Sequence, residues 1–167
     1  METPNHDPAA NGLETPTLTD EDWEAVQRYA QAIFACGRRS IHGPSHWTRV
    51  EKVGLELARE TGADPTVVRL FAMLHDTCRL NDDKDPGHGP RAADMLGTLI
   101  GILLTIDPGR LVLLEQAIRH HTDGQTSEDP TIGTCWDADR LDLGRVGTSP
   151  EGRYMSTEEG KKRAAIS

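Results

Sequence analysis

Apolar residues recur with a helical period along this chain from Thr19 onward, and no segment alternates convincingly every second residue. Three of the Asp-Pro pairs in this chain, at 64–65, 107–108 and 129–130, are typical helix starts, because Asp caps the free backbone N–H groups and Pro fits the first turn. The pattern predicts an all-α fold with about six core helices. We expect them over about residues 20–38, 45–60, 65–76, 90–105, 108–123 and 130–143.

The ends of the chain differ from this helical middle. Residues 1–18 lack apolar periodicity and are interpreted as a flexible N-terminal segment, and 19–146 as one compact domain. The polar, turn-rich residues 147–167 are either a tail or a flap over a functional site. The chain length suits a single domain with a substantial core.

Polar side chains interrupt the apolar stripes of three predicted helices. His46 shares a helical face with Val50 and Leu57, and the pair His75-Asp76 ends a helix that is otherwise nearly all apolar. His121 continues an apolar stripe of its helix, whereas the adjacent His120 is turned about 100° away. We therefore expect these side chains, apart from His120, to point inward.

The sixth predicted helix carries three aspartates in WDADRLD, and only Asp139 falls on the predicted apolar face of Ile132 and Cys135. Burying one carboxylate alone costs several kcal/mol unless it is paired or bound to metal. A single inward histidine is more often a core residue than a ligand. A shared metal ion would explain the whole set at once: His46, His75, Asp76, His121 and Asp139.

Composition narrows the partners and the compartment. The net charge of −9 and 4% aromatic content disfavour general nucleic-acid binding, although a metal ion and a few arginines could still hold a small anionic substrate. Cys36, Cys78 and Cys135 show no paired spacing and suggest reduced thiols. The N-terminus lacks a secretory signal pattern, and the longest apolar run, LIGILLTI at 99–106, is too short to span a bilayer. We expect a cytoplasmic protein with no membrane association.

The order of the candidate ligands resembles the HD superfamily of metal-dependent phosphohydrolases. His46 lies in SHWTRV, His75-Asp76 in FAMLHDTCR and Asp139 in DADRLDLGR, and the resemblance covers about residues 25–146. It implies an α-helical HD-domain fold in which these four residues hold one divalent metal. Some HD subfamilies bind a second metal through additional histidines. His88 in PGHGPRAA and His121 in AIRHHTDG are candidates, with Asp76 bridging the two ions.

Each additional histidine has an alternative interpretation. His88 could be a solvated loop residue or a helix cap, and His120 a solvated residue. His42 lies four residues before His46 and is a candidate for supporting the ligands from outside the metal's coordination sphere. His6 belongs to the N-terminal segment.

The chemistry that the resemblance implies is hydrolysis of a small phosphoester or nucleotide-like substrate by metal-activated water. Imidazole and carboxylate ligands suit Mn, Fe, Co, Ni or Zn, as one ion or two. Besides Asp76, candidate catalytic residues are Arg79 and Arg140 at phosphate oxygens, and His121 as general acid if it is not a ligand. Arg91 is a third phosphate candidate, and each arginine could instead be a surface charge or pair with a neighbouring aspartate.

Two other functions remain open. One is a di-iron oxygenase on the same scaffold, and the other is a non-catalytic small-molecule sensor. The chain lacks the GYP element of cyclic-dinucleotide phosphodiesterases, since HHTDG is followed by QTSED, so that substrate class is not carried over. The sequence does not identify the substrate. It also leaves the oligomeric state open, and a homo-oligomer is one of the possibilities.

Overall fold

The computed structural model describes residues 18–166 and confirms an all-α fold. The described residues form one compact domain of seven α-helices and two short 3₁₀ helices. The α-helices are α1 (Asp20–Ile33), α2 (Pro44–Thr61), α3 (Pro65–Leu74), α4 (His88–Leu99), α5 (Pro108–His120), α6 (Pro130–Leu141) and α7 (Glu158–Ala164), and the 3₁₀ helices are η1 (Asp142–Val146) and η2 (Gly152–Tyr154). The expected N-terminal segment lies outside the described residues except for Leu18, which packs on the core.

The Asp-Pro pairs at 64–65, 107–108 and 129–130 start helices as predicted. Asp85-Pro86 instead lies in the loop before α4. Asp64 Oδ1 accepts hydrogen bonds from the backbone N–H groups of Thr66 at 2.9 Å and Val67 at 3.3 Å. Asp107 and Asp129 make the same pair of bonds at the starts of α5 and α6. Each aspartate therefore satisfies two of the N–H groups that a helix leaves free at its first turn.

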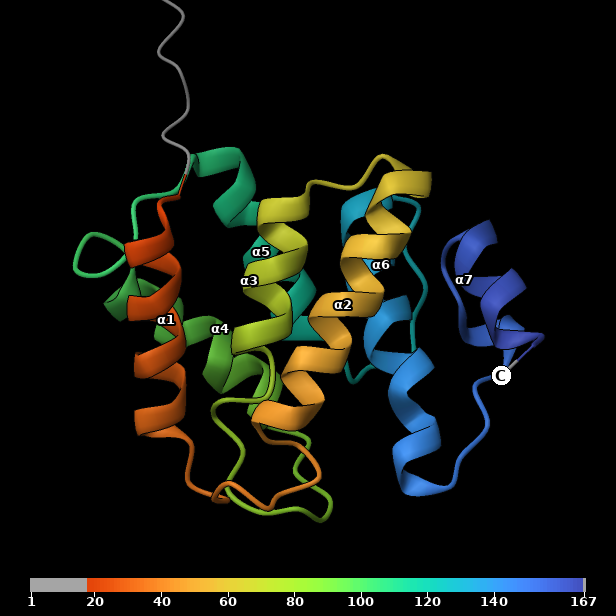
Figure 1. Ribbon diagram of the computed structural model, residues 1–167, viewed down its shortest axis with the longest axis horizontal. Coiled ribbons are helices and arrows are strands. Elements are labelled where there is room, and N and C mark those ends of the chain that lie inside the picture. Colours follow the sequence, from red (N-terminus) through yellow and green to blue (C-terminus); the bar gives the residue numbers. More distant parts are fainter. Residues whose placement is uncertain (1–17, 167) are drawn as a thin grey trace, which may run out of the picture.

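Helix α3 lies at the centre of the domain and packs against α1, α2, α5 and α6 (Figure 1). Seven of its ten residues are buried, so it is apolar almost all round rather than on one face. The helix ends at Leu74, directly before His75 and Asp76. The most apolar helix thus delivers a histidine and an aspartate into the interior.

Two predicted helices extend five or six residues beyond their observed C-terminal ends. The first ends at Ile33 rather than near Arg38, because the chain turns through Gly37 with φ +81°. The fourth ends at Leu99 rather than Thr105, because Gly101 adopts φ +81° and Ile100 forms an isolated bridge with Leu104. Within residues 18–166, no helix has both the length and the apolar character that crossing a bilayer requires.

The C-terminal segment contains α7, which the sequence analysis did not predict. Figure 1 shows α7 beside α6, and it also contacts α2. Its anchor is the buried carboxylate of Asp137 on α6, which accepts hydrogen bonds from Ser156 N at 2.7 Å, Thr157 N at 2.8 Å and Thr157 Oγ1 at 2.7 Å. Gly160 is fixed by the same contact, since a Cβ there would collide with the Asp137 carboxylate.

Asp137→Ala should release this segment from α6, because three donors lose a charged acceptor inside the protein. We expect a loss of about 2–4 kcal/mol in the free energy of unfolding, which corresponds to a melting temperature lower by roughly 2–4 °C per kcal/mol. Thermal unfolding and limited proteolysis after residue 147 would measure it. Asp94→Ala, at an exposed ion pair with Arg119, is the control and should change little. An equal effect of both substitutions would contradict the anchoring role.

Candidate metal centre

Six side chains meet where α2, α3, α4, α5 and α6 converge. They form three overlapping groups in which the ligand atoms lie within 4.8 Å of one another. The members are His46 on α2, His75 and Asp76 after α3, His88 at the start of α4, His121 after α5 and Asp139 on α6. Five of the six are buried, as the helical spacing predicted for His46, His75, Asp76 and His121. The described residues thus include buried groups that could hold a metal ion.

Four ligand atoms form the first half of the cluster. His46 Nε2 lies 3.2 Å from His75 Nε2 and 3.2 Å from Asp139 Oδ1. Asp76 Oδ2 completes the group at 3.7 Å from His46 Nε2 and 3.6 Å from His75 Nε2. Two imidazoles and two carboxylates therefore surround one small space.

The second half uses the other oxygen of the same aspartate. Asp76 Oδ1 lies 2.9 Å from His88 Nε2 and 3.6 Å from His121 Nε2, and the two nitrogens are 2.8 Å apart. Asp76 thus turns Oδ2 to one histidine pair and Oδ1 to the other. This is the geometry that a carboxylate bridging two ions requires.

These spacings match the edges of a metal coordination sphere. Two ligand atoms that each bind an ion at about 2.1 Å, with angles of about 90–110° between them, lie roughly 3.0–3.4 Å apart. The His46–His75 and His46–Asp139 contacts fall in this range, and the remaining ligand contacts lie within a few tenths of an ångström of it.

The histidine tautomers give independent support for a cation. The Nδ1 of each ligand histidine faces an oxygen acceptor: Asp142 Oδ2 for His46, the Phe71 and Ala72 carbonyls for His75, the Asp85 carbonyl for His88 and the Ile118 carbonyl for His121. With the proton on Nδ1, each Nε2 presents a lone pair to the cluster. Lone pairs at 2.8–3.2 Å repel unless a cation lies between them, so the donor set fits a metal.

The charge states also suit metal binding. Burial lowers the pKa of His75 to about 4, so its imidazole stays neutral at neutral pH. Burial opposes ionisation of Asp76, but the surrounding imidazoles, His75 first and then His121, His42 and His88, outweigh it and hold the pKa of Asp76 well below the usual value. Burial likewise opposes ionisation of Asp139, but its neighbours, His46 foremost, outweigh this effect and lower the pKa of Asp139. Both carboxylates are therefore anionic where a cation would bind.

A further layer of polar groups holds the cluster. His42 Nδ1 donates to Asp76 Oδ2 at 2.9 Å, consistent with the expected support from outside the coordination sphere. Asp142 binds His46 and also accepts from Arg49 Nε at 2.7 Å, and Arg145 Nη2 lies 3.4 Å from His42 Nδ1. The sequence analysis missed Asp142 and Arg145. The sequence motif DADRLDLGR could have indicated them, because it contains both residues within six positions after Asp139.

The prediction that only one aspartate of WDADRLD faces the interior is wrong. Asp137 is fully buried, and the Asp142 side chain is 11% exposed against 20% for Asp139. Every residue from Thr131 to Ala138 is buried, because α2, α3, α5 and α7 cover several sides of α6. A single apolar stripe therefore does not define the buried side of this helix.

The predicted arginines have different surroundings. Arg79 is buried beside the second histidine pair, with Nη1 3.3 Å from His88 Nε2 and 3.7 Å from Asp76 Oδ1, while Nη2 donates to the Asp83 carbonyl. Arg91 pairs with Asp85 and the Cys78 carbonyl.

Arg140 and His120 lie outside the cluster. Arg140 Nη1 donates to the Tyr154 carbonyl at 2.6 Å, and its guanidinium lies over the Trp136 ring. No hydrogen bond or ion pair among the described residues joins Arg140 to the cluster. His120 has a 46% exposed side chain that pairs with Asp123, as expected for a solvated residue.

The exposed edge of the cluster lies at Asp139. Its side chain is 20% exposed, whereas those of His46, His75, His88, His121 and Asp76 are at most 4% exposed. His42, with a 15% exposed side chain, is the next most accessible neighbour. A small molecule would therefore approach from the side of Asp139 and His42.

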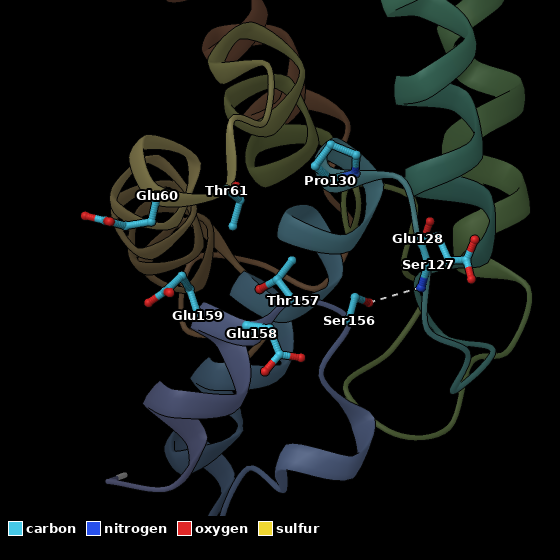
Figure 2. A pocket seen from close by; sticks show the side chains of 9 residues that line it. All are labelled: Glu60, Thr61, Ser127, Glu128, Pro130, Ser156, Thr157, Glu158 and Glu159. Carbon is cyan, nitrogen blue, oxygen red and sulfur yellow. Dashed lines mark hydrogen bonds between the residues drawn. The ribbon is translucent and has the colours of Figure 1, made fainter.

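A separate hollow of about 280 Å³ lies at the other end of α6 (Figure 2). Figure 2 shows Glu60 and Thr61 from α2, Pro130 from α6, and Glu158 and Glu159 from α7 around it. None of its lining residues belongs to the metal-ligand cluster. Pro130 and Asp139 are nine residues apart on one helix, about 13 Å along its axis, so this hollow is not the entrance to the cluster.

Comparisons with protein-family models, with curated proteins and with solved structures find no match. The helical fold and the His/Asp cluster are compatible with an HD domain. The assignment of a metal centre therefore depends on the geometry of the chain itself.

Substitutions of adjacent histidines would test the ligand set. His121→Ala and His88→Ala should each lower the metal content per chain relative to the wild type, whereas Asp76→Ala, which removes the shared carboxylate, should abolish metal binding. His120→Ala is the matched control and should retain the wild-type metal content. Elemental mass spectrometry on untagged protein gives the stoichiometry. Full metal content in Asp76→Ala would contradict the centre described above.

Asp142 should tune affinity without being a ligand. Removing the carboxylate that holds His46 Nδ1 frees the ring to rotate, so Asp142→Ala should weaken metal binding by about 10–100-fold with unchanged stoichiometry. Competition with a chromogenic chelator would measure this. Asp123→Ala, which breaks the exposed pair with His120, is the control, and an equal affinity in both variants would exclude the orienting role.

Proposed function

We propose that this chain is a metal-dependent phosphohydrolase of the HD type that cleaves a small phosphoester or nucleotide-like substrate. The observation that carries the proposal is the placement of Asp76 between two histidine pairs, with one oxygen toward each. Together with Asp139, these residues would hold one or two divalent ions. The order of the ligands along the chain also resembles that superfamily.

When bound there, a divalent ion supplies an acidified water as nucleophile and polarises a phosphoryl oxygen. The residues of the chain arrange this chemistry. His42 donates to Asp76 and Asp142 accepts from His46, so both ligands keep their orientation without a rearrangement during turnover. Asp139 lies at the accessible edge, where a substrate would meet the cluster.

Two arginines could neutralise the anionic substrate. Arg79 lies against Asp76 and His88, and its burial strengthens its field in the cluster. Arg145, beside His42 at the accessible side, has a 10% exposed side chain and is the better placed of the two to meet a phosphate oxygen from solvent. We therefore add Arg145 to the substrate-binding candidates, alongside Arg79 from the sequence. Arg140, the other arginine expected from the sequence, is not proposed for this role, because no hydrogen bond or ion pair among the described residues joins it to the cluster.

A di-iron oxygenase is the second candidate. His88 and His121 lie close to Asp76, and this supports a di-iron oxygenase and a two-metal hydrolase equally, because both kinds of enzyme use the additional histidines. The metal decides between them. Two iron ions with oxygen consumption would support the oxygenase, whereas ligand binding without turnover would support the non-catalytic sensor.

The hydrolase is tested by turnover of p-nitrophenyl phosphate, bis-p-nitrophenyl phosphate and nucleoside phosphates with added Mn²⁺, Co²⁺, Ni²⁺, Zn²⁺ or Fe²⁺. We expect metal-dependent hydrolysis that falls at least about 10³-fold in His75→Ala and Asp76→Ala, because the nucleophile is lost. His120→Ala should keep wild-type activity. Hydrolysis that survives in Asp76→Ala, or its absence with every metal when the centre is fully loaded, would overturn the proposal.

A further inference from the structure

A second cavity lies between the C-terminal end of α6, the turn that follows α5 and the segment leading to η2. Its volume is about 160 Å³. Leu143, Tyr154 and Met155 give it apolar walls, and Thr148 and Ser149 offer hydroxyl groups. This is smaller than the roughly 300–1,000 Å³ of pockets for drug-sized ligands, so it suits a compact molecule or one end of a larger one.

Arg140 lines this cavity and carries an unsatisfied donor. The residue is only 8% exposed, and its Nη1 is used by the Tyr154 carbonyl. Its Nη2 is buried and is the single side-chain nitrogen or oxygen among the described residues that is both buried and without a hydrogen-bond partner. A buried charged donor without an acceptor is costly, and a bound group that the structure lacks is one of the few physical explanations.

The charges around the cavity select an anion. Glu151 lines the rim, but its carboxylate pairs with Arg153 at 2.8 Å. Asp139 and Asp137 act on Arg140 through their fields, yet neither carboxylate is hydrogen-bonded to it. Among the residues that line the cavity, the guanidinium of Arg140 is therefore the cationic group that no carboxylate neutralises by a direct hydrogen bond.

We propose that this cavity is a binding site for a small molecule with an anionic oxygen, a carboxylate or a phosphate, which accepts from Nη2 of Arg140. The Thr148 and Ser149 hydroxyls are within the same cavity and can bind the polar remainder of the ligand. The site flanks the metal cluster, because Arg140 directly follows Asp139 and Gly124 lies three residues beyond His121. It does not depend on the chemistry of that cluster.

The test is calorimetric titration of inorganic phosphate and, separately, acetate into the full-length protein at constant ionic strength. The protein is first depleted of metal with a chelator and checked by elemental analysis, so that phosphate cannot report the metal centre. We expect saturable one-site binding of at least one probe. Arg140→Gln should weaken it about 10–100-fold, the loss expected for a charge-assisted hydrogen bond.

Lys162→Gln is the matched control, because it removes one positive charge at a side chain that is 69% exposed and whose partner, Glu159, does not line this cavity. It should bind like the wild type. Ser149→Leu, at an exposed position, narrows the cavity without touching Arg140, and should also weaken binding if Arg140→Gln does not fold. Absence of saturable binding of both probes, unchanged binding in Arg140→Gln, or equal loss in Lys162→Gln would overturn the proposal. None of these outcomes bears on the hydrolase, which is read from metal-loaded protein.

Discussion

The carboxylate of Asp76 is the constraint on which the interior of this protein depends. It is almost fully buried and contacts His42, His88 and Arg79, with His46, His75 and His121 close by. An isolated carboxylate at this depth would be strongly unfavourable. The structure stabilises this carboxylate by bringing polar side chains from α2, α4 and α5 toward one point. The packing of these helices around α3 and the stabilisation of the buried charge therefore depend on each other.

The neighbours of the cluster show how such a centre is kept rigid. Each ligand histidine is held at Nδ1, and three of the four holding groups are backbone carbonyl oxygens of α3, α5 or the turn before α4. The His75 ring is in addition stacked on Phe71, with centroids 4.8 Å apart. A backbone acceptor cannot rotate away as a side chain can, so most of the ring orientations are set by the fold itself. His46 is the exception, because its orientation depends on the side chain of Asp142.

The parts of the structure that follow local rules could be predicted from the sequence. Three Asp-Pro pairs, at 64–65, 107–108 and 129–130, mark helix starts, and helical spacing separated the buried His121 from the exposed His120. The burial of Asp137 and the role of α7 could not be predicted, because they arise from contact between residues 137 and 156–160 in space. The hydrogen bond between Asp142 and His46 joins residues 96 positions apart in the sequence. Asp142 lies just past the end of α6, so the helical periodicity of α6 does not predict where its side chain points.

The spread of the ligands along the chain has a consequence for folding. The candidate ligands run from residue 46 to residue 139 and come from five different helices or their ends, so no local fragment contains a complete site. The complete set of candidate ligands is therefore brought together only when α2 to α6 have assembled. The free energy of metal binding would then add to the free energy of unfolding of the whole domain. The concentration of free metal would therefore affect how long the chain stays folded.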